Sequence, residues 1–578
     1  MSNTITTAAL FEQYVVAGNH AASDYFSLIR KLICLRDGCP RDSEAYSGSQ
    51  KEIDRIYRLI EDELKTNALR PKSEVKFGTS GWRGIIGKDI FAKSVALVTR
   101  AIVGMYEDLD TSAVLANALG VKSLAEARQR GCVLGYDNRF GGEILARTAC
   151  DVLTSFGFAV LYAGEATTGT LSASLLIHKA AFSINLTPSH NPLEYAGFKF
   201  NAADGGPAAS EVTNTITAKA RALIQNDQPL LLSPKPSLVK PLDALGAWFE
   251  LVRRGRDKHG LDHRQTMAAF TAADNIFIAV DCVHGASRVH VRELFHDIAS
   301  PRLLFLRDNA DPTFGGVAPE PSTANMRAVT EILRQRPEPL KLGIIMDPDA
   351  DRIRFTDGET EIDMNTFGAM AYHFLHEVKG KKGMVAKTVA TSNFANQLAT
   401  ALGEEVFEPR VGFKEFKPVI DRALICFEES DGITTIGHTP EKDAYIGLLL
   451  AIDMVLTLQK NLGDYRQELR DTYGYFYPDR DGVTVSQQGE ELGRTLAKLE
   501  KYGVGAGVRV GEEQKKIAKV IDIDGRKMIL EDDSWLMIRP SGTEPKVRFY
   551  VEARTEAGKK ALFAAAKAML AEIGLLKA

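Results

Sequence analysis

The sequence predicts an α/β protein in which strand–helix–strand units recur along the chain, followed by a smaller C-terminal domain of a different type. Short apolar runs typical of buried strands alternate with segments of helical periodicity from residue 131 to about residue 460. Strands that alternate with helices form sheets with helices on both faces. After about residue 470 successive strands dominate. We therefore expect doubly wound α/β units and a C-terminal α+β domain.

Length and composition describe a large globular protein. A chain of 578 residues is long enough for about three to five domains. Its hydrophobic content of 45% and charged content of 25% suit a chain that buries a large core. The formal charge of −4 gives no electrostatic reason to expect nucleic acid as a partner.

The cysteines and the apolar segments predict a cytoplasmic protein. Six cysteines are scattered without the paired spacing of a zinc site or a disulfide framework, which favours reduced thiols. Residues 1–7 lack the features of a signal peptide. The longest apolar run, 447–458, contains Asp453 and is too short to span a bilayer.

Residues 1–72 are expected to form an N-terminal helical extension. Apolar side chains recur at helical spacing in residues 51–64, with charges on the opposite face. We expect this extension to pack on the first α/β domain, and nothing in it indicates chemistry.

The first α/β domain is predicted over residues 73–232. It begins with a glycine-rich segment, 76–84, in which Arg83 and two hydroxyls suit close approach of the backbone to an anion. An ordinary glycine-rich turn is the alternative, and the segment lacks the ending of a P-loop. The pattern then predicts a doubly wound parallel unit with strands 132–136, 159–162 and 180–186 and helices 143–156 and 171–179.

The segment 187–192 (Thr-Pro-Ser-His-Asn-Pro) follows the buried strand 180–186 directly. Its two prolines favour a loop at the carboxyl end of the strand, where open α/β sheets handle ligands. Ser189 beside His190, with Lys199 shortly afterwards on the continuing loop 197–201, is the pattern of a covalent phosphoryl or acyl carrier. An ordinary polar loop is the alternative.

The second α/β domain is predicted over residues 233–357, with strands 276–281 and 342–346 and helix 324–336. The last strand ends in three carboxylates at alternate positions, Asp347, Asp349 and Asp351. Oxygen ligands that converge on one cation select a hard metal, Mg²⁺ first. A solvated acidic turn is the alternative, and the flanking pattern excludes an EF-hand.

The third α/β domain is predicted over residues 358–468. Its strand 424–427 leads into the segment 428–430 (Glu-Glu-Ser), whose two adjacent glutamates suit hydrogen bonding to vicinal sugar hydroxyls. The other expected elements are helices 364–378 and 393–402 and strands 384–388 and 405–408. Each of the three α/β units places a polar loop at the same end, which predicts a threefold internal repeat.

The C-terminal domain is predicted over residues 469–578. Two strands, 534–538 and 547–552, enclose the segment 539–546 (Arg-Pro-Ser-Gly-Thr-Glu-Pro-Lys). An arginine, two hydroxyls and a glycine backbone amide together make a good phosphate clamp.

Five of these segments together resemble the α-D-phosphohexomutase superfamily, which includes phosphoglucomutases and phosphomannomutases. They are 78–84 (Gly-Thr-Ser-Gly-Trp-Arg-Gly), 187–192, 347–352 (Asp-Pro-Asp-Ala-Asp-Arg), 428–430 (Glu-Glu-Ser) and 539–546. The resemblance covers residues 75–578. It implies four domains around a central cleft, three doubly wound mixed-sheet α/β units and a smaller C-terminal α+β domain.

The resemblance also implies a reaction. Ser189 would carry the phosphoryl group, and Mg²⁺ would be held by Asp347, Asp349, Asp351 and a phosphate oxygen on Ser189. The expected enzyme is a phosphohexomutase that moves phosphate between the 1- and 6-positions of a hexose through a 1,6-bisphosphate, which would also serve as activator.

Roles for the remaining residues follow from their positions in the motifs. Lys199 and Arg83 are expected to act as acid/base or charge-stabilising groups, and His190 and Arg352 to support the serine and metal loops. The groups expected to bind the sugar hydroxyls and the non-reacting phosphate are Glu428, Ser430, Lys442, Arg539, Ser541, Gly542 and Thr543.

The sugar loop departs from the usual family pattern at two positions. Phe427 precedes the first glutamate, where glycine is usual, and Asp431 follows Ser430, where the family has no aspartate. A Glu-Glu-Ser core favours glucose phosphates over mannose phosphates, but Asp431 leaves that choice open.

Two alternatives to a phosphoglucomutase are a glucose-1,6-bisphosphate synthase of the same fold and a non-catalytic sugar-phosphate sensor. Hexose phosphates are the expected partners, without nucleic acid or membrane, for a monomer or homodimer. The extension is expected either to cover the mouth of the cleft or to mediate oligomerisation.

Overall fold

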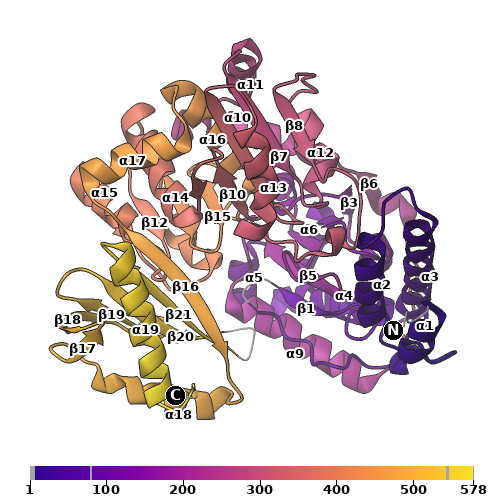
Figure 1. The fold of residues 1–578 in the computed structure, drawn as a ribbon. Coiled ribbons are helices and arrows are strands. Elements are labelled where there is room, and N and C mark those ends of the chain that lie inside the picture. The colour runs from indigo at the N-terminus through magenta and orange to yellow at the C-terminus, as the bar shows by residue number, and fades with distance from the viewer. Residues whose placement is uncertain (1–6, 79–80, 542–545, 577–578) are drawn as a thin grey trace, which may run out of the picture. The chain divides into compact units, whose positions relative to one another are not determined.

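The computed structural model describes residues 7–78, 81–541 and 546–576 (Figure 1). The chain forms two compact units. The first comprises Met1–Leu251, Val280–Asn325 and Ile345–Asp351, and the second comprises Val252–Ala279, Met326–Ile344 and Arg352–Ala578. The boundary between the units falls inside two strands, so one sheet contributes to both.

Three helices precede the first sheet: α1 (Thr7–Tyr14), α2 (Tyr25–Asp37) and α3 (Glu44–Thr66). The side chains of Asp24 and Ser43 accept hydrogen bonds from the first turns of α2 and α3, as N-caps do. The buried apolar faces of α2 and α3 belong to the same hydrophobic cluster as the first sheet. The extension is thus helical and packs on the first sheet, and α3 is longer than the pattern over 51–64 indicates.

The first sheet has the order β1-β5-β4-β2-β3-β6. Its strands are β1 (Trp82–Ile85), β2 (Cys132–Tyr136), β3 (Val160–Glu165), β4 (Phe182–Leu186), β5 (Tyr195–Ala202) and β6 (Val239–Pro241). Helix α7 (Gly142–Ser155) covers one face, backed by α4 (Ala92–Glu107) and then α9 (Ser210–Asn226), while α8 (Thr168–His178) covers the other.

This sheet is mixed rather than purely parallel. Strands β3 and β4 pair with β2 in parallel, but β5 pairs with both β4 and β1 in antiparallel orientation. The expectation that residues 197–201 continue a loop was therefore wrong, because they lie within β5. Alternate side chains of a strand face opposite sides. Phe198 and Phe200 enter the core beneath the sheet, so Lys199 points to the other side.

The three α/β sheets share one strand order. The series β3-β2-β4-β5 is repeated as β8-β7-β9-β10 and as β13-β12-β14-β15. The later strands are β7 (Ile276–Asp281), β8 (Leu303–Leu306), β9 (Leu340–Met346), β10 (Ile353–Thr356), β12 (Val385–Lys387), β13 (Val406–Phe407), β14 (Ile425–Glu428) and β15 (Gly432–Thr435), with β11 (Glu361–Ile362) beside β10. Ser189, the three aspartates and the segment 428–430 all lie at the end of the third strand of their series or in its connection to the fourth. The topology therefore confirms the threefold repeat.

Helices also surround the second and third sheets. They are α10 (Ala244–His259), α11 (His263–Ala272), α12 (Ser287–Leu294), α13 (Thr323–Arg334), α14 (Met364–His373), α15 (Phe394–Leu402), α16 (Ala444–Leu458) and α17 (Leu462–Tyr473). The helix expected over 364–378 changes at Phe374 to a π-helical turn that ends at Val378.

The C-terminal domain is a six-stranded sheet in the order β16-β21-β20-β19-β18-β17. Its strands are β16 (Tyr477–Thr484), β17 (Gly507–Val510), β18 (Glu513–Ile521), β19 (Arg526–Leu530), β20 (Trp535–Pro540) and β21 (Lys546–Ala553). All described pairings in it are antiparallel. Helix α19 (Glu556–Glu572) lies across one face, as Figure 1 shows, and shares a core with α18 (Gly489–Ala497). The α+β prediction is confirmed.

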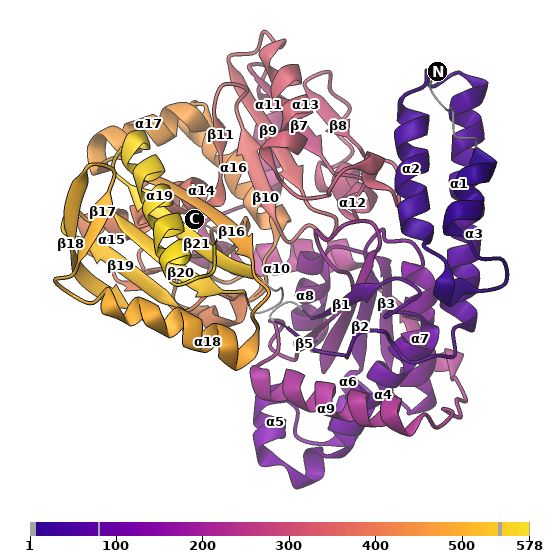
Figure 2. The ribbon, with the colours of Figure 1, turned by 60° about the horizontal axis from the view of Figure 1, so that its bottom comes forward.

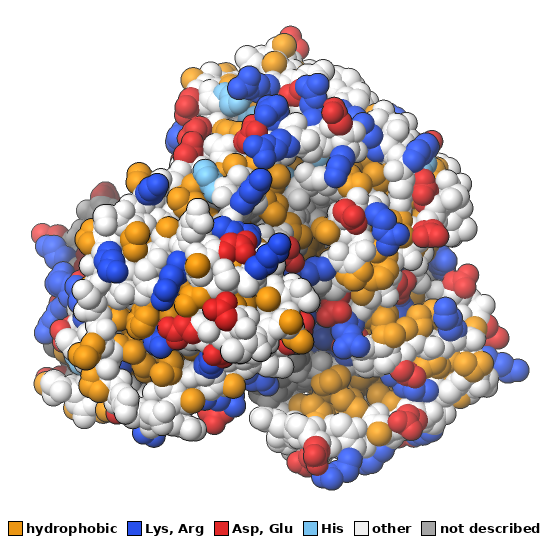
Figure 3. Space-filling view, turned by 180° about the vertical axis from the view of Figure 1, so that it is seen from behind, with side chains coloured by type: hydrophobic (Ala, Val, Ile, Leu, Met, Phe, Trp, Pro, Cys, Tyr) orange, Lys and Arg blue, Asp and Glu red, His pale blue; other side chains and the backbone are white. Residues whose placement is uncertain are grey.

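Surface charge and helix hydropathy can be described for one face of the molecule and for the described helices. On the face in Figure 3, acidic and basic side chains are interspersed. Within the described ranges no single helix is long and apolar enough to cross a membrane, and one bent pair, α16 with α17 at 78°, meets the criteria of length and composition.

Candidate active site

Ser189 lies in the tight connection between β4 and β5. Its φ of +57° is in the left-handed region, which a residue with a side chain rarely adopts. The Ser189 N–H donates to Thr187 Oγ1 at 2.8 Å, and that hydroxyl donates to Asp137 Oδ2 at 2.7 Å. Ser189 is only 1% exposed. Side-chain hydrogen bonds from the end of β2 therefore hold this loop in a strained conformation.

Arg139 supports the same loop through hydrogen bonds to its backbone carbonyls. Its Nη1 donates to the Pro192 carbonyl at 2.7 Å and its Nη2 to the Ser189 carbonyl at 2.6 Å. Burial lowers the pKa of Arg139 to about 10, partly offset by the Asp137 carboxylate. The sequence analysis did not identify Asp137 or Arg139 as site residues, because Asp137-Asn138-Arg139 has the composition of an ordinary turn. The signal that could have identified these two residues is their charge, because they directly follow the buried strand β2.

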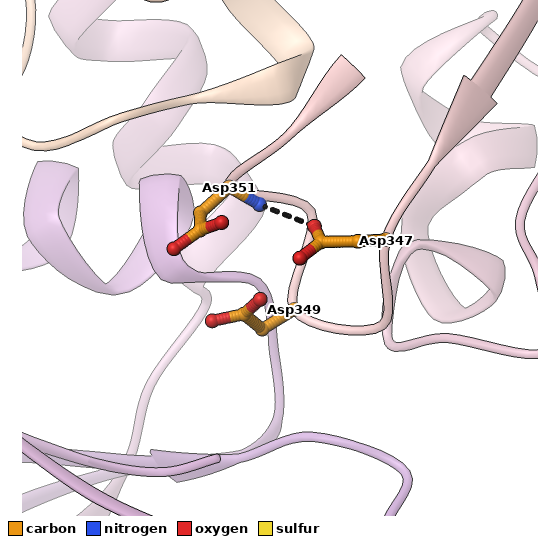
Figure 4. A group of neighbouring side chains, drawn as sticks. All are labelled: Asp347, Asp349 and Asp351. Atoms are coloured by element: carbon orange, nitrogen blue, oxygen red, sulfur yellow. Dashed lines mark hydrogen bonds between the residues drawn. The ribbon is translucent and has the colours of Figure 1, made fainter. Parts of the chain in front are cut away.

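The three aspartates converge in the connection between β9 and β10 (Figure 4). One oxygen from each of Asp347, Asp349 and Asp351 lies within 4.8 Å of the others, and all three residues are buried. The Asp351 N–H donates to Asp347 Oδ1 at 3.0 Å, which tightens the loop. Ser189 Oγ donates to Asp347 Oδ2 at 2.7 Å. The serine hydroxyl and the carboxylate cluster thus form one site within the first unit.

Lys199 reaches the cluster from β5. Its Nζ donates to Asp349 Oδ2 at 2.6 Å and to Asp351 Oδ2 at 2.8 Å. Thr168 Oγ1 also donates to Asp349 Oδ2, at 2.7 Å. In the part of the chain that the structure describes, Asp349 Oδ1 has no hydrogen-bond partner. Three buried carboxylates with one lysine and an oxygen that lacks a donor fit a hard divalent cation.

Arg83 and His190 also contact the serine loop. Arg83, on β1, donates from Nη1 to Asn191 Oδ1 at 2.8 Å. His190 Nδ1 lies 3.4 Å from Ser189 Oγ. The structure thus brings four predicted groups around Ser189, namely the acidic cluster, Lys199, His190 and, through Asn191, Arg83.

A second group of predicted residues lies in the second unit. Glu428 Oε1 accepts a hydrogen bond from the Gly412 N–H at 2.9 Å, and Ser430 Oγ lies 3.5 Å from Glu428 Oε2. Burial raises the pKa of Glu428, while the positive charges of Lys442 and Arg352 oppose that rise. These electrostatic interactions place all four predicted residues of this region in one neighbourhood.

Arg539, in the predicted phosphate clamp, is connected to the sugar loop through Asp524. Arg539 Nε lies 3.1 Å from Asp524 Oδ2, and the same oxygen accepts from the Val411 N–H at 3.0 Å. Val411 precedes the Gly412 that binds Glu428. The Ser541 N–H donates to the Lys546 carbonyl at 2.8 Å. Gly542 and Thr543 lie outside the described residues.

Comparisons with known proteins match four families along the chain. These are phosphoglucomutase/phosphomannomutase α/β/α domain I at residues 74–227, domain II at 261–360, domain III at 363–473 and the C-terminal domain at 490–568. Together they match well over half of the chain. Residues 1–73, which include α1, α2 and α3, precede the first match.

Two curated relatives and one solved structure extend the comparison. A probable phosphoglucosamine mutase of Methanosphaera stadtmanae is 26% identical over 480 residues, covering 83% of this chain and 94% of the relative. A phosphoglucomutase/phosphomannomutase of Thermococcus kodakarensis is 26% identical over 489 residues, covering 83% and 95%. The crystal structure of a putative phosphomannomutase from Thermus thermophilus aligns with a TM-score of 0.69 at 25% identity, covering 86% of this chain and 99% of that chain.

Proposed function

The chain belongs to the α-D-phosphohexomutase superfamily and is a hexose phosphate mutase, and we propose that Ser189 carries the phosphoryl group that it transfers. The observation that carries this proposal is the 2.7 Å contact between Ser189 Oγ and Asp347 Oδ2 in a strained, buried loop. A strained residue held by surrounding contacts is typical of a functional position.

The reaction proceeds as two phosphoryl transfers. In the first, the bond between phosphorus and Ser189 Oγ breaks, a bond to a sugar hydroxyl forms, and the hydroxyl proton ends on Ser189 Oγ. The hexose 1,6-bisphosphate turns over, and its other phosphate returns to the serine. Free bisphosphate would act as activator by restoring phosphoserine.

Charge stabilisation comes from several groups around the serine. Asp347, Asp349 and Asp351 would hold Mg²⁺ together with a phosphate oxygen on Ser189, and such an ion neutralises charge on the transferring group. Lys199 supplies a positive charge next to Asp349 and Asp351. Arg83 and His190, which contact Asn191 and Ser189, position the loop or stabilise charge on the transferring group.

The second group of residues binds the substrate. Glu428, Ser430 and Lys442 hold ring hydroxyls, and Arg352 supports the metal loop that it directly follows. The non-reacting phosphate is gripped by Arg539, Ser541, Gly542 and Thr543. The chain of contacts from Glu428 through Gly412, Val411 and Asp524 to Arg539 supports joint action of the two loops.

Glucose phosphates are the favoured substrates, with mannose phosphates next. The Glu-Glu-Ser core supports glucose, while the relative from Methanosphaera stadtmanae is named for glucosamine, so that sugar belongs among the candidates. A bisphosphate synthase and a sugar-phosphate sensor are the outcomes to be distinguished.

The organisation of the chain is part of the proposal. The domains are residues 73–232, 233–357, 358–468 and 469–578 after the extension 1–72. The protein is cytoplasmic and a monomer or homodimer. Six free thiols, four of them buried, support a reducing compartment.

Phosphorus NMR tests the activity directly. Protein with Mg²⁺, glucose 1-phosphate and catalytic glucose 1,6-bisphosphate should convert the ester to the 6-phosphate. Mannose and glucosamine 1-phosphates run in parallel to rank the sugars. Ser189→Ala should abolish conversion, whereas Ser47→Ala, at an exposed position of α3, should not.

Three other results of these experiments would each contradict the proposed mutase mechanism. Bisphosphate that accumulates when a phosphoryl donor is supplied would replace the mutase with a bisphosphate synthase. Binding of sugar phosphate without conversion or labelling of Ser189 would indicate a sensor. Full activity of Ser189→Ala would disprove the phosphoserine mechanism.

A further inference from the structure

The N-terminal helices contact the surroundings of Ser189 at three separate places. They stand next to the first sheet in Figure 2, and α2 and α3 pack against each other. Residues 1–73 precede the family matches, so these helices lie outside the matched domains.

The first contact reaches the serine loop itself. The guanidinium of Arg30, on α2, forms an ion pair with the Glu194 carboxylate. Glu194 is five residues after Ser189 and immediately precedes β5. Its side chain is 15% exposed, and Arg30 is its charged partner among the described residues. This pair connects α2 to the end of the loop that carries the serine.

The second contact is made by α3 beside Arg139. The rings of Tyr57 and Phe140 have centroids 4.4 Å apart. A Cβ placed on Gly141 would lie 2.3 Å from Leu64 Cδ1, so a larger residue there would displace the Leu64 side chain of α3, and the φ of +78° at this position also favours glycine. Phe140 and Gly141 directly follow Arg139, whose guanidinium holds the Ser189 carbonyl.

The third contact reaches Arg139 through the ring of Phe314. The Phe314 ring lies 4.4 Å from Arg139 Cζ, in a cation–π arrangement. Phe314 belongs to a short 3-10 turn that ends at Gly316. Gly316 packs on α2, because a Cβ there would lie 2.6 Å from Ile33 Cγ2. Helix α2 thus supports the turn whose ring covers the guanidinium.

We infer that the N-terminal helices are a brace that holds the Ser189 loop in its strained, transfer-competent conformation. The three contacts connect α2 and α3 to the end of the serine loop and to the residues beside Arg139. The inference rests on the proposed role of Ser189, since bracing affects catalysis only if this serine takes part. Small errors in the position of a reacting group lower the rate steeply, so loss of the brace acts on kcat rather than on sugar binding.

A charge reversal tests the brace without removing the extension. Arg30 is 47% exposed, so Arg30→Glu leaves the core intact while it repels Glu194. We expect faster amide hydrogen exchange in a peptide that covers residues 187–195, and a three- to tenfold lower kcat with KM within twofold. The double variant Arg30→Glu/Glu194→Arg should restore both the slow hydrogen exchange over 187–195 and the wild-type kcat. Lys65→Glu, a charge reversal at an exposed position of α3, is the matched control and should change neither.

Tyr57→Leu tests the second contact independently. It keeps an apolar side chain at this position but removes the ring contact with Phe140, and it should increase exchange in the same peptide. Unchanged exchange over 187–195 in both Arg30→Glu and Tyr57→Leu would overturn the brace. Faster exchange with unchanged kcat would overturn its role in the reaction. A wild-type protein without mutase activity would contradict the proposed function, and the exchange measurement would still decide whether the helices hold the loop.

Discussion

Arg354 on β10 forms an ion pair with Asp431 in the sugar loop, with 2.8 Å between Arg354 Nη2 and Asp431 Oδ2. The Asp431 carbonyl also accepts from the Ile353 N–H at 2.9 Å. Asp431 has a φ of +71°, a conformation that favours glycine. The residue that departs from the family pattern therefore ties the sugar loop to the strand that follows the metal loop.

Removing one partner of this pair should be costly. The two side chains are 16% and 4% exposed, so Asp431→Asn leaves a largely buried guanidinium with Glu361 as its remaining charged partner. We expect a loss of about 3 kcal/mol in the free energy of unfolding, measured by urea unfolding. The double variant Arg354→Met/Asp431→Asn should recover most of it. Equal stability of the single and double variants would contradict a coupled pair.

Metal binding should depend on Asp349. Its Oδ1 has no hydrogen-bond partner within the described residues, and the buried cluster contains two further carboxylates. Asp349→Asn should weaken Mn²⁺ binding at least tenfold, as followed by electron paramagnetic resonance of the free ion. Asp308→Asn, which alters a partly exposed pair with Arg292, should bind as wild type does. Equal affinity in both variants would place the ion elsewhere.

Arg139 should be irreplaceable even by lysine. A lysine keeps the charge but cannot reproduce the planar pair of donors that binds the Pro192 and Ser189 carbonyls. Arg139→Lys should lower kcat about 10- to 100-fold with little change in KM, measured by a coupled assay. Arg147→Lys on the exposed side of α7 is the control. An unaffected kcat would show that the serine loop does not need this arginine.

The stability of the C-terminal domain should depend on pH through Lys527. Lys527 donates to the Val389 carbonyl at 2.8 Å, and burial lowers its pKa from 10.5 to about 8. Between these values the unfolded chain binds the proton that the folded chain has released, so stability rises with pH. Wild type should gain up to about 3 kcal/mol over Lys527→Met from pH 8 to pH 10.5.

Urea midpoints at several pH values test this prediction. The Lys527→Met curve should fall progressively below the wild-type curve as pH rises. Lys519→Met, at an exposed position of β18, should follow wild type. Parallel profiles for all three proteins would show that the lysine keeps its ordinary pKa.

The local sequence pattern was sufficient for most elements. The strand expected at 132–136 is β2, and the helix expected at 324–336 is α13 with a boundary shifted by one or two residues. These segments are strongly periodic, and their signal depends on near neighbours in the chain. The antiparallel strand β5 was missed because Pro192 and two glycines mark its surroundings as a loop.

The site was predictable to the extent that its residues lie in compact motifs. Ser189 and the three aspartates occupy polar loops after apolar strands, and the structure brings these loops together. Their chemical roles stay predictions. Arg139 was not found, because its importance depends on carbonyls 50 or more residues away in the chain.

The sequence by itself determined the α/β repeat, the C-terminal domain, the family and the motifs that carry the chemistry. Each of these features depends on residues that are close together in the chain. Only the tertiary structure decided on which side of β5 the Lys199 side chain lies and which residue forms the ion pair with Asp431. It also decided which residues the N-terminal helices contact. Each of these depends on pairing between segments far apart in the chain, such as Arg30 with Glu194. Strand register and helix packing select such pairs, and periodicity within one segment contains no information about the partner.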